Sequence, residues 1–223
     1  MKILVTGGSG YIGSCLVPLL LNEGHEVTVL DKLMFGSDGM ISYFHEKKFF
    51  FIKGDITNEE TVKESVKNKD LIIHLAAYVG YPLCKKFPKE ANEVNVYGSQ
   101  IIDKCRGSTP LLFGSTGSNY GVVTDNICTE DTPLNPISLY GETKTSAENL
   151  FRKSGNSICY RFATAFGMSP RMRLDLMVND FCYKAAIDKN LIVYEASFKR
   201  IFIHVRDIAK SFIFAINNYE KMV

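Results

Sequence analysis

A tyrosine and a lysine stand four residues apart, at Tyr140 and Lys144 in the run YGETK. On a helix this spacing places the two side chains on one face. A free phenol has a pKa of about 10, too high for a base at neutral pH, but an ammonium group one turn away stabilises the phenolate and lowers that pKa. The pair therefore has the chemistry of a general acid and base, and Thr116, in a hydroxyl-rich stretch upstream, can hydrogen-bond the same substrate oxygen. The alternative is a surface pair without a chemical role, so the surrounding elements have to decide.

The first thirteen residues, MKILVTGGSGYIG, bring three glycines to the point where a strand should pass into a helix. Residues 2–6 are apolar and β-branched, as in a buried strand, and Gly7, Gly10 and Gly13 follow. A helix N-terminus offers unpaired backbone N–H groups to a phosphate, and glycines let a pyrophosphate approach the backbone. Asp31 ends the next apolar run, about 20 positions on, where a dinucleotide requires an acidic residue for its ribose hydroxyls. We therefore predict a dinucleotide site, the alternative being an ordinary strand–helix turn.

Strand-like and helix-like runs alternate through residue 166. We expect strands at residues 2–6, 26–30, 49–53, 71–75, 111–113 and 157–162, and helices at residues 11–22, 58–66, 88–105 and 139–153. Thr57 is expected to cap the second helix, with Glu60 completing a capping box. The alternation predicts an α/β fold of the Rossmann type, a doubly wound parallel sheet with right-handed crossovers. Ligands of such sheets bind outside the carboxyl ends of the strands, where the glycines, Asp31 and Thr116 all fall.

The regular alternation of strand-like and helix-like runs ends at about residue 166. We expect a helix at residues 174–188, a short strand that contains Ile192 and Val193, a strand at residues 201–204 and a last helix at residues 207–217. We therefore predict a dinucleotide-binding Rossmann domain at residues 1–166. Residues 167–223 are predicted to form part of a smaller substrate-binding lobe, interleaved with the last elements of the sheet and incomplete.

Composition and charge exclude several classes of function. A net charge of +2 on a mixed background of acidic and basic residues gives no basic stripe, so nucleic-acid binding has no electrostatic support. The six cysteines and four histidines are scattered, which favours reduced thiols over disulfides and argues against a metal site. No apolar run approaches membrane-spanning length, and the N-terminus has the pattern of a first strand rather than of a signal peptide. We expect a cytoplasmic protein that binds no nucleic acid, no membrane and no metal.

Further motifs connect these features with a known family. They are GDI at residues 54–56, HLAA at residues 74–77, VNV at residues 94–96 and STGSNYG at residues 115–121. Together with the glycine loop and YGETK, they resemble the extended short-chain dehydrogenase/reductases. More narrowly, they resemble the NAD-dependent nucleotide-sugar epimerase/dehydratase branch, in the manner of UDP-glucose/galactose 4-epimerases. The resemblance implies that Tyr140 is the catalytic acid and base, that Lys144 holds the nicotinamide ribose and lowers the tyrosine pKa, and that Thr116 is the hydroxyl partner.

The same resemblance assigns a set of positions to the cofactor. These are Gly7, Gly10, Tyr11, Ile12, Gly13, Asp31, Lys32, Asp55, Ile56, Leu75, Ala76, Ala77, Asn95, Ser115, Tyr140, Lys144 and Phe162. NAD is favoured over NADP, because the Asp31 carboxylate would repel a 2′-phosphate even with Lys32 beside it. Asn95 is expected to pin the loop beside the active site. Structural alternatives remain for three of these positions, since Asp55 can cap a helix, Asn95 can bond backbone groups and Phe162 can serve packing alone.

A second set of positions is implied for a nucleotide-diphosphate sugar. Arg200, in RIFIHV, matches a phosphate-binding arginine, and the guanidinium group suits phosphate through its bidentate geometry. Thr164 and Asn179 match polar positions on the substrate side, as does the hydroxyl of Thr116. Arg171 and its neighbour Arg173 are looser candidates, and the alternative for each arginine is a surface residue.

The stretch after Thr116 bears on the kind of reaction. Relatives that eliminate water carry at least one Glu directly after the loop Ser or Thr, because elimination needs a carboxylate for the C5 proton and an acid for the leaving hydroxyl. Gly117 and Ser118 occupy those positions here and can do neither. The prediction is therefore a nucleotide-sugar 4-epimerase that acts by transient oxidation and re-reduction. An NAD(P)-dependent sugar or carbonyl reductase or dehydrogenase, and a non-catalytic dinucleotide-binding protein, stay open as alternatives.

Two expectations concern the whole assembly. The smaller domain of the family normally continues well past the last helix of this chain, so we expect the 223 residues to bind the cofactor with doubtful turnover on their own. Relatives dimerise through the helix after Pro88 and the helix that carries Tyr140. Apolar residues on the two helices suit either a homodimer interface or packing on the sheet, namely Val94, Ile101 and Ile102 on one and Ala147 and Leu150 on the other. We predict a homodimer.

Overall fold

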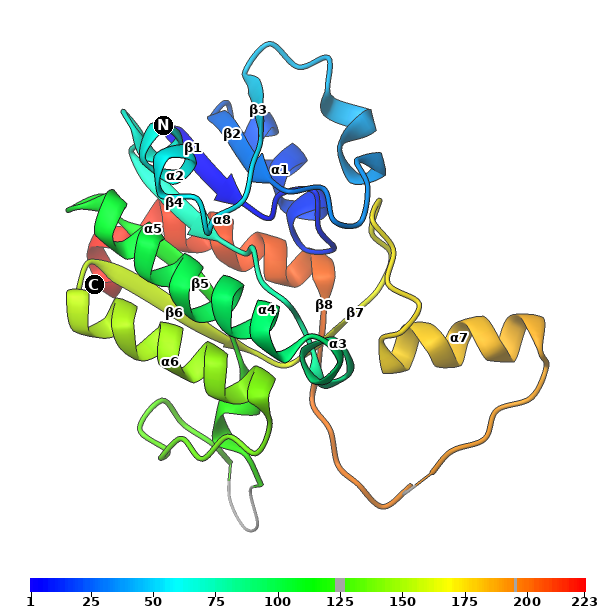
Figure 1. Ribbon diagram of the computed structural model, residues 1–223. Coiled ribbons are helices and arrows are strands. Elements are labelled where there is room, and N and C mark those ends of the chain that lie inside the picture. Colours follow the sequence, from blue (N-terminus) through cyan, green and yellow to red (C-terminus); the bar gives the residue numbers. More distant parts are fainter. Residues whose placement is uncertain (123–126, 195) are drawn as a thin grey trace.

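The protein is built on one parallel sheet of six strands. The computed structural model describes residues 1–122, 127–194 and 196–223 (Figure 1). Residues 123–126 of the long loop expected after the fifth strand, and residue 195, lie outside the described residues. The strands are β1 (Lys2–Thr6), β2 (Glu26–Asp31), β3 (Phe49–Lys53), β4 (Leu71–His74), β5 (Leu111–Thr116) and β6 (Ser157–Phe162). Their order, β3-β2-β1-β4-β5-β6, with every pair parallel, confirms the predicted α/β Rossmann sheet.

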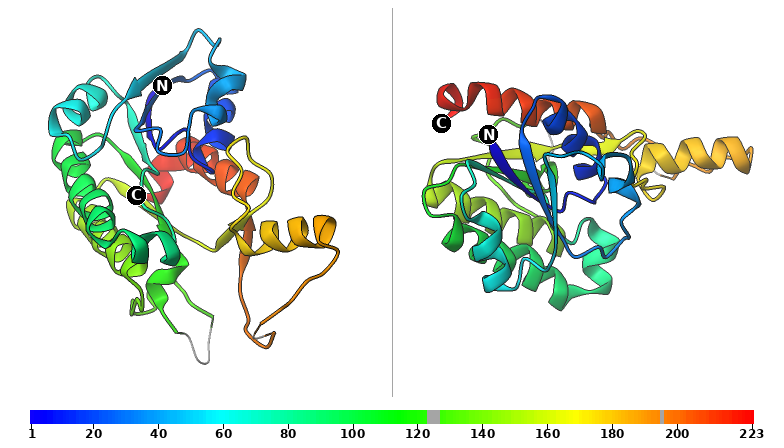
Figure 2. Two further views of the ribbon diagram at one scale, coloured as in Figure 1. Left: turned by 45° about the vertical axis from the view of Figure 1, so that its right-hand side comes forward. Right: turned by 90° about the horizontal axis from the view of Figure 1, so that it is seen from above.

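Helices cover both faces of this sheet, as Figure 2 shows. The helices on one face are α1 (Gly13–Asn22) and α8 (Val205–Met222), and those on the other are α2 (Glu59–Val66), α5 (Ser99–Arg106) and α6 (Leu139–Ser154). Successive side chains of a strand point to opposite faces, so Ile3 and Val5 pack in the core below α1 and α8, while Leu4 packs in the core below α2, α5 and α6. Burial on both faces explains why the central strands are continuously apolar.

The segment between β4 and α5 is a series of short helices rather than one. It contains α3 (Tyr81–Lys86), α4 (Pro88–Asn92) and the π-helical stretch η2 (Glu93–Gly98), which runs directly into α5. The helix expected at residues 88–105 is therefore unbroken, but its middle part, η2, has π-helical instead of α-helical hydrogen bonding. The polar stretch after β2 likewise holds a short 3-10 helix, η1 (Asp38–Tyr43).

Two local predictions are corrected by the structure. Asn58, and not Thr57, caps α2, because the Asn58 Oδ1 atom accepts a hydrogen bond of 2.9 Å from the Thr61 N–H group. The Thr57 N–H group instead donates to the Asp55 carboxylate at 3.0 Å in the preceding turn. β5 also runs on to Thr116 instead of ending at Phe113, because its pairing with β6 continues through residues 114–116.

The segment after β6 extends away from the sheet. It contains β7 (Thr164–Phe166), α7 (Met177–Ile187) and β8 (Phe202–His204), and β7 pairs with β8 in a two-stranded parallel sheet. In Figure 1, α7 projects from the body, and a long connection returns from it to β8. The strand predicted around Ile192 and Val193 is wrong, since this stretch has no regular structure. Within the described residues, no helix is long and apolar enough to cross a membrane.

Candidate active site

Tyr140 and Lys144 lie on the first turns of α6, on its inward face. Ser138 caps the helix by accepting a hydrogen bond of 3.2 Å from the Gly141 N–H group. Lys144 is only 4% exposed, and its Nζ atom lies 3.9 Å from the centre of the Phe113 ring. Burial lowers the pKa of Lys144 to about 7, and it raises the pKa of Tyr140 to about 12. The lowering of the tyrosine pKa expected from the neighbouring amine is therefore absent in the protein alone, because desolvation dominates.

Thr116 meets Tyr140 at the carboxyl end of β5. Its side-chain hydroxyl lies near enough to the phenol to oppose the rise in the Tyr140 pKa. The Thr116 Oγ1 atom also accepts a hydrogen bond of 3.2 Å from the Ser118 N–H group, which starts the 3-10 turn η3 (Gly117–Tyr120). The hydroxyl, the phenol and the amine predicted from the sequence to act together thus come from two elements and reach one place.

The glycine loop lies between β1 and α1 with almost no room for side chains. Gly7 has a φ of +72°, and a Cβ atom there would lie 2.6 Å from the backbone nitrogen of Ala76. A Cβ atom at Gly13 would lie 2.5 Å from the Cα atom of Gly8. Glycine at these positions lets α1 begin directly above the end of β1, with its first N–H groups unobstructed by side chains. The loop has the form that a pyrophosphate requires.

Asp31, at the end of β2, joins this loop from the next strand. Its two carboxylate oxygens accept hydrogen bonds from the Ser9 N–H group at 3.0 Å and from the Leu33 N–H group at 2.8 Å. Burial raises the pKa of Asp31, and these two backbone donors oppose the rise. The carboxylate is therefore held beside the glycine loop, in the position that a ribose diol requires.

One cavity of about 2570 Å³ runs along the carboxyl ends of the strands. It connects the glycine loop with Thr116 and Tyr140 and continues to the arginines of the C-terminal segment. The predicted site residues that line it are Gly7, Gly10, Tyr11, Ile12, Gly13, Asp31, Lys32, Asp55, Ile56, Leu75, Ala76, Ala77, Ser115, Thr116, Tyr140, Lys144, Phe162, Thr164, Arg171 and Arg200. Among the described residues, no group of three or more His, Cys, Asp or Glu side chains could hold a metal ion.

Two predicted site residues, Asn95 and Asn179, lie behind the cavity wall. Asn95 bonds both backbone groups of Tyr78, accepting at 2.7 Å and donating at 3.0 Å, so it supports the loop after β4 as expected. Asn179 accepts from the Gly167 N–H group at 2.9 Å and donates to the Tyr11 hydroxyl at 3.2 Å. Its amide also donates to the Arg173 carbonyl group, so Asn179 holds the segment after β7 together and does not line the cavity.

The charged residues around the cavity differ in how firmly they are held. Lys32 and Asp55 form an ion pair with 2.6 Å between the Nζ and Oδ2 atoms. Burial alone would raise the pKa of Asp55, but Lys32 and the Thr57 N–H group outweigh it and lower that pKa. The Arg171 guanidinium lies 4.1 Å from the centre of the Phe35 ring, whereas Arg200 is exposed at the cavity edge.

The sequence prediction missed a buried cluster next to Tyr140 and Lys144. Glu148 lies on α6 one turn beyond Lys144, and its carboxylate bonds Ser115, Asn119 and Arg161. The signal was present in the sequence, since Tyr140, Lys144 and Glu148 follow one another at four-residue intervals and share one helix face.

A six-stranded Rossmann sheet with a glycine loop at one strand end and a Tyr–Lys pair near another is typical of dinucleotide-dependent enzymes. The model of the NAD dependent epimerase/dehydratase family matches residues 3–223, and the chain belongs to this family. The chain is 37% identical over 155 residues to a UDP-glucose 4-epimerase of Lactobacillus helveticus, a match that covers 67% of this chain and 46% of that protein. The chain thus spans about half the length of the first curated relatives it matches.

Other relatives widen the range of activities. The low-salt glycan biosynthesis protein Agl12 of Haloferax volcanii is 32% identical over 219 residues, which cover 93% of this chain and 70% of that protein. Among solved structures, the UDP-glucose 4-epimerase of Thermus thermophilus in complex with NAD superposes with a TM-score of 0.83. That match has 25% identity and covers 96% of this chain and 74% of the other. A dTDP-glucose 4,6-dehydratase of Streptomyces venezuelae shares the fold, with a TM-score of 0.88 at 24% identity. That match covers 97% of this chain and 72% of the dehydratase chain.

NAD is the cofactor of this family, and the residues present fit it. The glycine loop leaves a cradle that a Cβ atom at Gly7 or Gly13 would fill, as a pyrophosphate demands. Asp31 would hold the adenosine ribose, and Lys144 would reach the ribose of the nicotinamide. The carboxylate at the end of β2 disfavours a 2′-phosphate, in agreement with NAD.

Proposed function

We propose that the protein is an NAD-dependent nucleotide-sugar 4-epimerase with Tyr140 as its acid and base. The observation that carries the proposal is the meeting of Thr116, Tyr140 and Lys144 in the cavity that also contains the glycine loop. This arrangement would bring a sugar hydroxyl to a proton acceptor and to a hydride acceptor at the same time. The family and the UDP-glucose 4-epimerase relatives support it.

Burial sets the resting state of the site. With a pKa of about 12, the Tyr140 phenol is protonated at neutral pH, and Lys144 titrates near pH 7. Bound NAD would supply a positive charge beside the phenol and would take a hydride from the sugar C4 atom and return it. That charge would favour release of the phenol proton to solvent. As phenolate, Tyr140 would then accept the proton of the C4 hydroxyl and give it back, while the Thr116 hydroxyl orients the same oxygen. Only one acid/base group is needed, because each cycle restores both the cofactor and the tyrosine.

The turn after β5 supports epimerisation over elimination. Gly117 and Ser118 directly follow Thr116, so the position from which relatives present a carboxylate to the sugar carries no acidic group. Glu148, which also borders the cavity, is bound to Arg161 and is not free to move protons. We infer that the site can oxidise and re-reduce C4 but cannot remove water from the sugar.

For the substrate diphosphate, the C-terminal segment offers exposed cations. Arg200 lines the cavity without an ion-pair partner among the described residues, and Arg171 lines it from the loop after β7. Guanidinium groups bind phosphate oxygens in pairs of hydrogen bonds. We propose that Arg200 binds the diphosphate, with Thr164 and Arg171 on the same side.

The test is an activity assay of the protein with a panel of nucleotide sugars. UDP-, GDP- and dTDP-hexoses are incubated with NAD, and both C4 epimers and NADH are measured. We expect interconversion of the epimers without net NADH in the wild type and its loss in Tyr140→Phe, whereas Tyr97→Phe, at an exposed tyrosine, stays active. Accumulation of NADH would indicate a dehydrogenase, and NAD binding without turnover of any sugar would indicate a non-catalytic protein. Unchanged turnover in Tyr140→Phe would overturn the catalytic assignment.

The homodimer and the cytoplasmic location stay predictions. Ile101, Ile102 and Ala147, which suited either an interface or the core, are buried in the core below α5 and α6. A dimer through this layer of helices would therefore use its opposite face, where Tyr97, on η2 directly before α5, is exposed. Sedimentation of the wild type against a Tyr97→Glu variant would test that interface.

A further inference from the structure

The Glu148 carboxylate is a buried ionic centre between three elements. Glu148 is 1% exposed, and its Oε1 atom accepts a hydrogen bond of 2.8 Å from the Arg161 Nε atom. The same oxygen lies 2.7 Å from the Arg161 Nη2 atom in an ion pair. The Oε2 atom accepts from the Ser115 hydroxyl at 2.6 Å and from the Asn119 amide at 2.8 Å. Because one charge-assisted hydrogen bond, an ion pair and two neutral hydrogen bonds hold this carboxylate, its position is closely determined.

The partners of Glu148 lie on both sides of Thr116. Ser115 precedes Thr116 on β5, and Asn119 lies in the turn that follows it. The Asn119 amide also donates to the Ser115 hydroxyl at 2.9 Å, which closes a triangle of hydrogen bonds among the side chains of Ser115, Asn119 and Glu148. Glu148 itself belongs to α6, the helix that carries Tyr140. One carboxylate therefore joins the strand end with Thr116 to the helix with the phenol.

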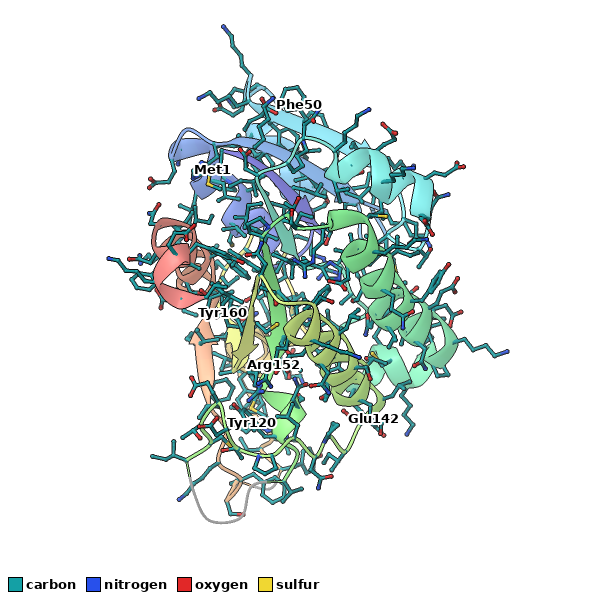
Figure 3. All side chains as sticks on the ribbon, turned by 90° about the vertical axis from the view of Figure 1, so that its left-hand side faces the viewer. Met1, Phe50, Tyr120, Glu142, Arg152 and Tyr160 are labelled. Carbon is teal, nitrogen blue, oxygen red and sulfur yellow. The ribbon has the colours of Figure 1, made fainter. Side chains whose placement is uncertain are left out.

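Arg161 extends the cluster to the far end of the same turn. From β6, its Nη1 atom donates to the Tyr120 hydroxyl and to the Glu130 carbonyl group, both at 3.0 Å. The guanidinium carbon lies 5.0 Å from the centre of the Tyr120 ring. Figure 3 labels Tyr120, in the turn after β5, and Glu142, on α6, at the same end of the molecule. The turn is thus held at its start and at its end by groups that depend on Glu148.

We propose that Glu148 is a positioning residue that fixes the Thr116 hydroxyl relative to the Tyr140 phenol. The proposal rests on the function proposed above, because the pair that it positions is the one assigned to proton transfer. Removing one partner of a buried ion pair leaves the other charge without compensation, so the turn must rearrange when Glu148 is neutralised. A displacement of about 1 Å in a reacting pair costs about 10²-fold in rate.

A purely structural ion pair is the competing explanation. It would stabilise the fold without affecting the placement of Thr116, and its loss would lower thermal stability alone. Two readouts separate the explanations: the NMR signal of the Thr116 methyl group, and the split between kcat and KM.

The experiment compares Glu148→Gln with Glu142→Gln, a change of an exposed carboxylate on the same helix. The 223-residue chain of 25.0 kDa is labelled with ¹³C-methyl threonine, and the Thr116 signal is assigned with Thr116→Ser. We expect Glu148→Gln to shift or broaden this signal while Glu142→Gln leaves it in place. In the activity assay we expect Glu148→Gln to lower kcat about 10²-fold with little change in KM.

Ser115→Ala keeps the test decisive if Glu148→Gln does not fold. It removes only the 2.6 Å hydrogen bond, and we expect a smaller shift of the Thr116 signal in the same direction. An unchanged Thr116 signal in whichever of the two variants is folded would overturn the proposal, as would an equal shift in Glu142→Gln. If the wild type interconverts no sugar while Glu148→Gln still displaces Thr116, the proposed function fails and the positioning role stands.

Discussion

The strands around the glycine loop and the segment after β7 differ sharply in burial. In β1 and β4 every residue except Lys2 is buried. In the connection from α7 to β8, by contrast, apolar side chains face outward, with Ile192 65% exposed and Tyr194 82% exposed. The first region is held by a core on both faces of a sheet, whereas the second has few contacts of its own.

The contrast separates the two halves of the proposed reaction. The residues assigned to NAD lie on elements that packing over-determines, so this part of the site is preorganised. The residues assigned to the sugar diphosphate lie on a segment joined to the body at few points, among them the hydrogen bond of 2.6 Å from the Tyr11 hydroxyl to the Gly167 carbonyl group. We therefore expect cofactor binding to depend on steric fit, and sugar binding to depend on a small number of polar contacts.

The sharpest way to break the first region is Gly7→Ala. The new Cβ atom would lie 2.6 Å from the backbone nitrogen of Ala76, and no side-chain motion can relieve a clash with backbone. We expect NAD binding to be lost in calorimetric titration. Gly155→Ala is the matched control, because Gly155 has nearly the same φ, +73°, and open space around it. A backbone effect alone would cost about 1–2 kcal/mol in both variants, so equal NAD affinity in both would contradict the steric argument.

A buried charge is the next target in the same region. Because the folded-state pKa of Lys144 is about 7, below its ordinary value, the folded chain binds fewer protons than the unfolded chain between that pH and about 10.4. The free energy of unfolding should rise with pH across this window. Lys144→Met removes the buried charge, and we expect a gain of about 1–4 kcal/mol below pH 7 that vanishes at high pH. Urea unfolding at several pH values measures it, with exposed Lys153→Met as control; a pH-independent difference would contradict the assignment.

In the exposed segment, Arg200→Ala should affect sugar binding alone. A hydrogen bond to a charged group contributes about 1.5–3 kcal/mol, so we expect affinity for the nucleotide sugar to fall about 10- to 100-fold. NAD affinity should not change. The measurement is a titration of UDP into the NAD complex of the protein. The control is Lys189→Ala, because Lys189 is exposed and lies outside the cavity lining. An equal loss of UDP affinity in Lys189→Ala would show that the loss in Arg200→Ala comes from the lower net charge and not from a direct contact with the diphosphate.

The smallest effect is expected where the two regions meet, at Tyr11. Tyr11→Phe removes the hydrogen bonds to the Gly167 carbonyl group and from the Asn179 amide but keeps the ring. We expect a loss of about 1 kcal/mol in stability and faster hydrogen exchange at Gly167, with NAD affinity nearly unchanged. Tyr219→Phe removes a hydroxyl bonded to Asn156 at the opposite end of the sheet and should leave exchange at Gly167 unaltered. If both variants behave alike, Tyr11 has no special role in joining the regions.

Much of the first region was predictable from the sequence. Alternating strands and helices indicate a parallel sheet, and the predicted β6 at residues 157–162 has the observed bounds. The end of β5 was not predictable, because residues 114–116 are extended only through their pairing with β6. The cap of α2 was wrong because Thr57 and Asn58 are both good capping residues, and the choice depends on the turn that Asp55 forms.

The exposed region was predicted less well for a related reason. Ile192 and Val193 have the β-branched character of a strand, but a strand also needs a partner for its backbone groups. The pairing of β7 with β8 joins residues 164–166 to residues 202–204, which no local pattern indicates. Asn179 matched a substrate-side position in the sequence, yet its side chain is hydrogen-bonded to Tyr11, Gly167 and Arg173.

By itself, the sequence determined the local chemistry. A helix is enough to bring Tyr140 and Lys144 onto one face, because they stand four residues apart. A strand–helix turn is enough to explain the glycines and Asp31 as parts of a dinucleotide site. The tertiary structure alone decided which of these groups meet and with what ionisation. Burial raised the pKa of Tyr140 instead of lowering it, and the convergence of β5, β6 and α6 placed Glu148 beside Thr116. Desolvation and long-range packing are properties of the folded chain, so no spacing along the sequence encodes them directly.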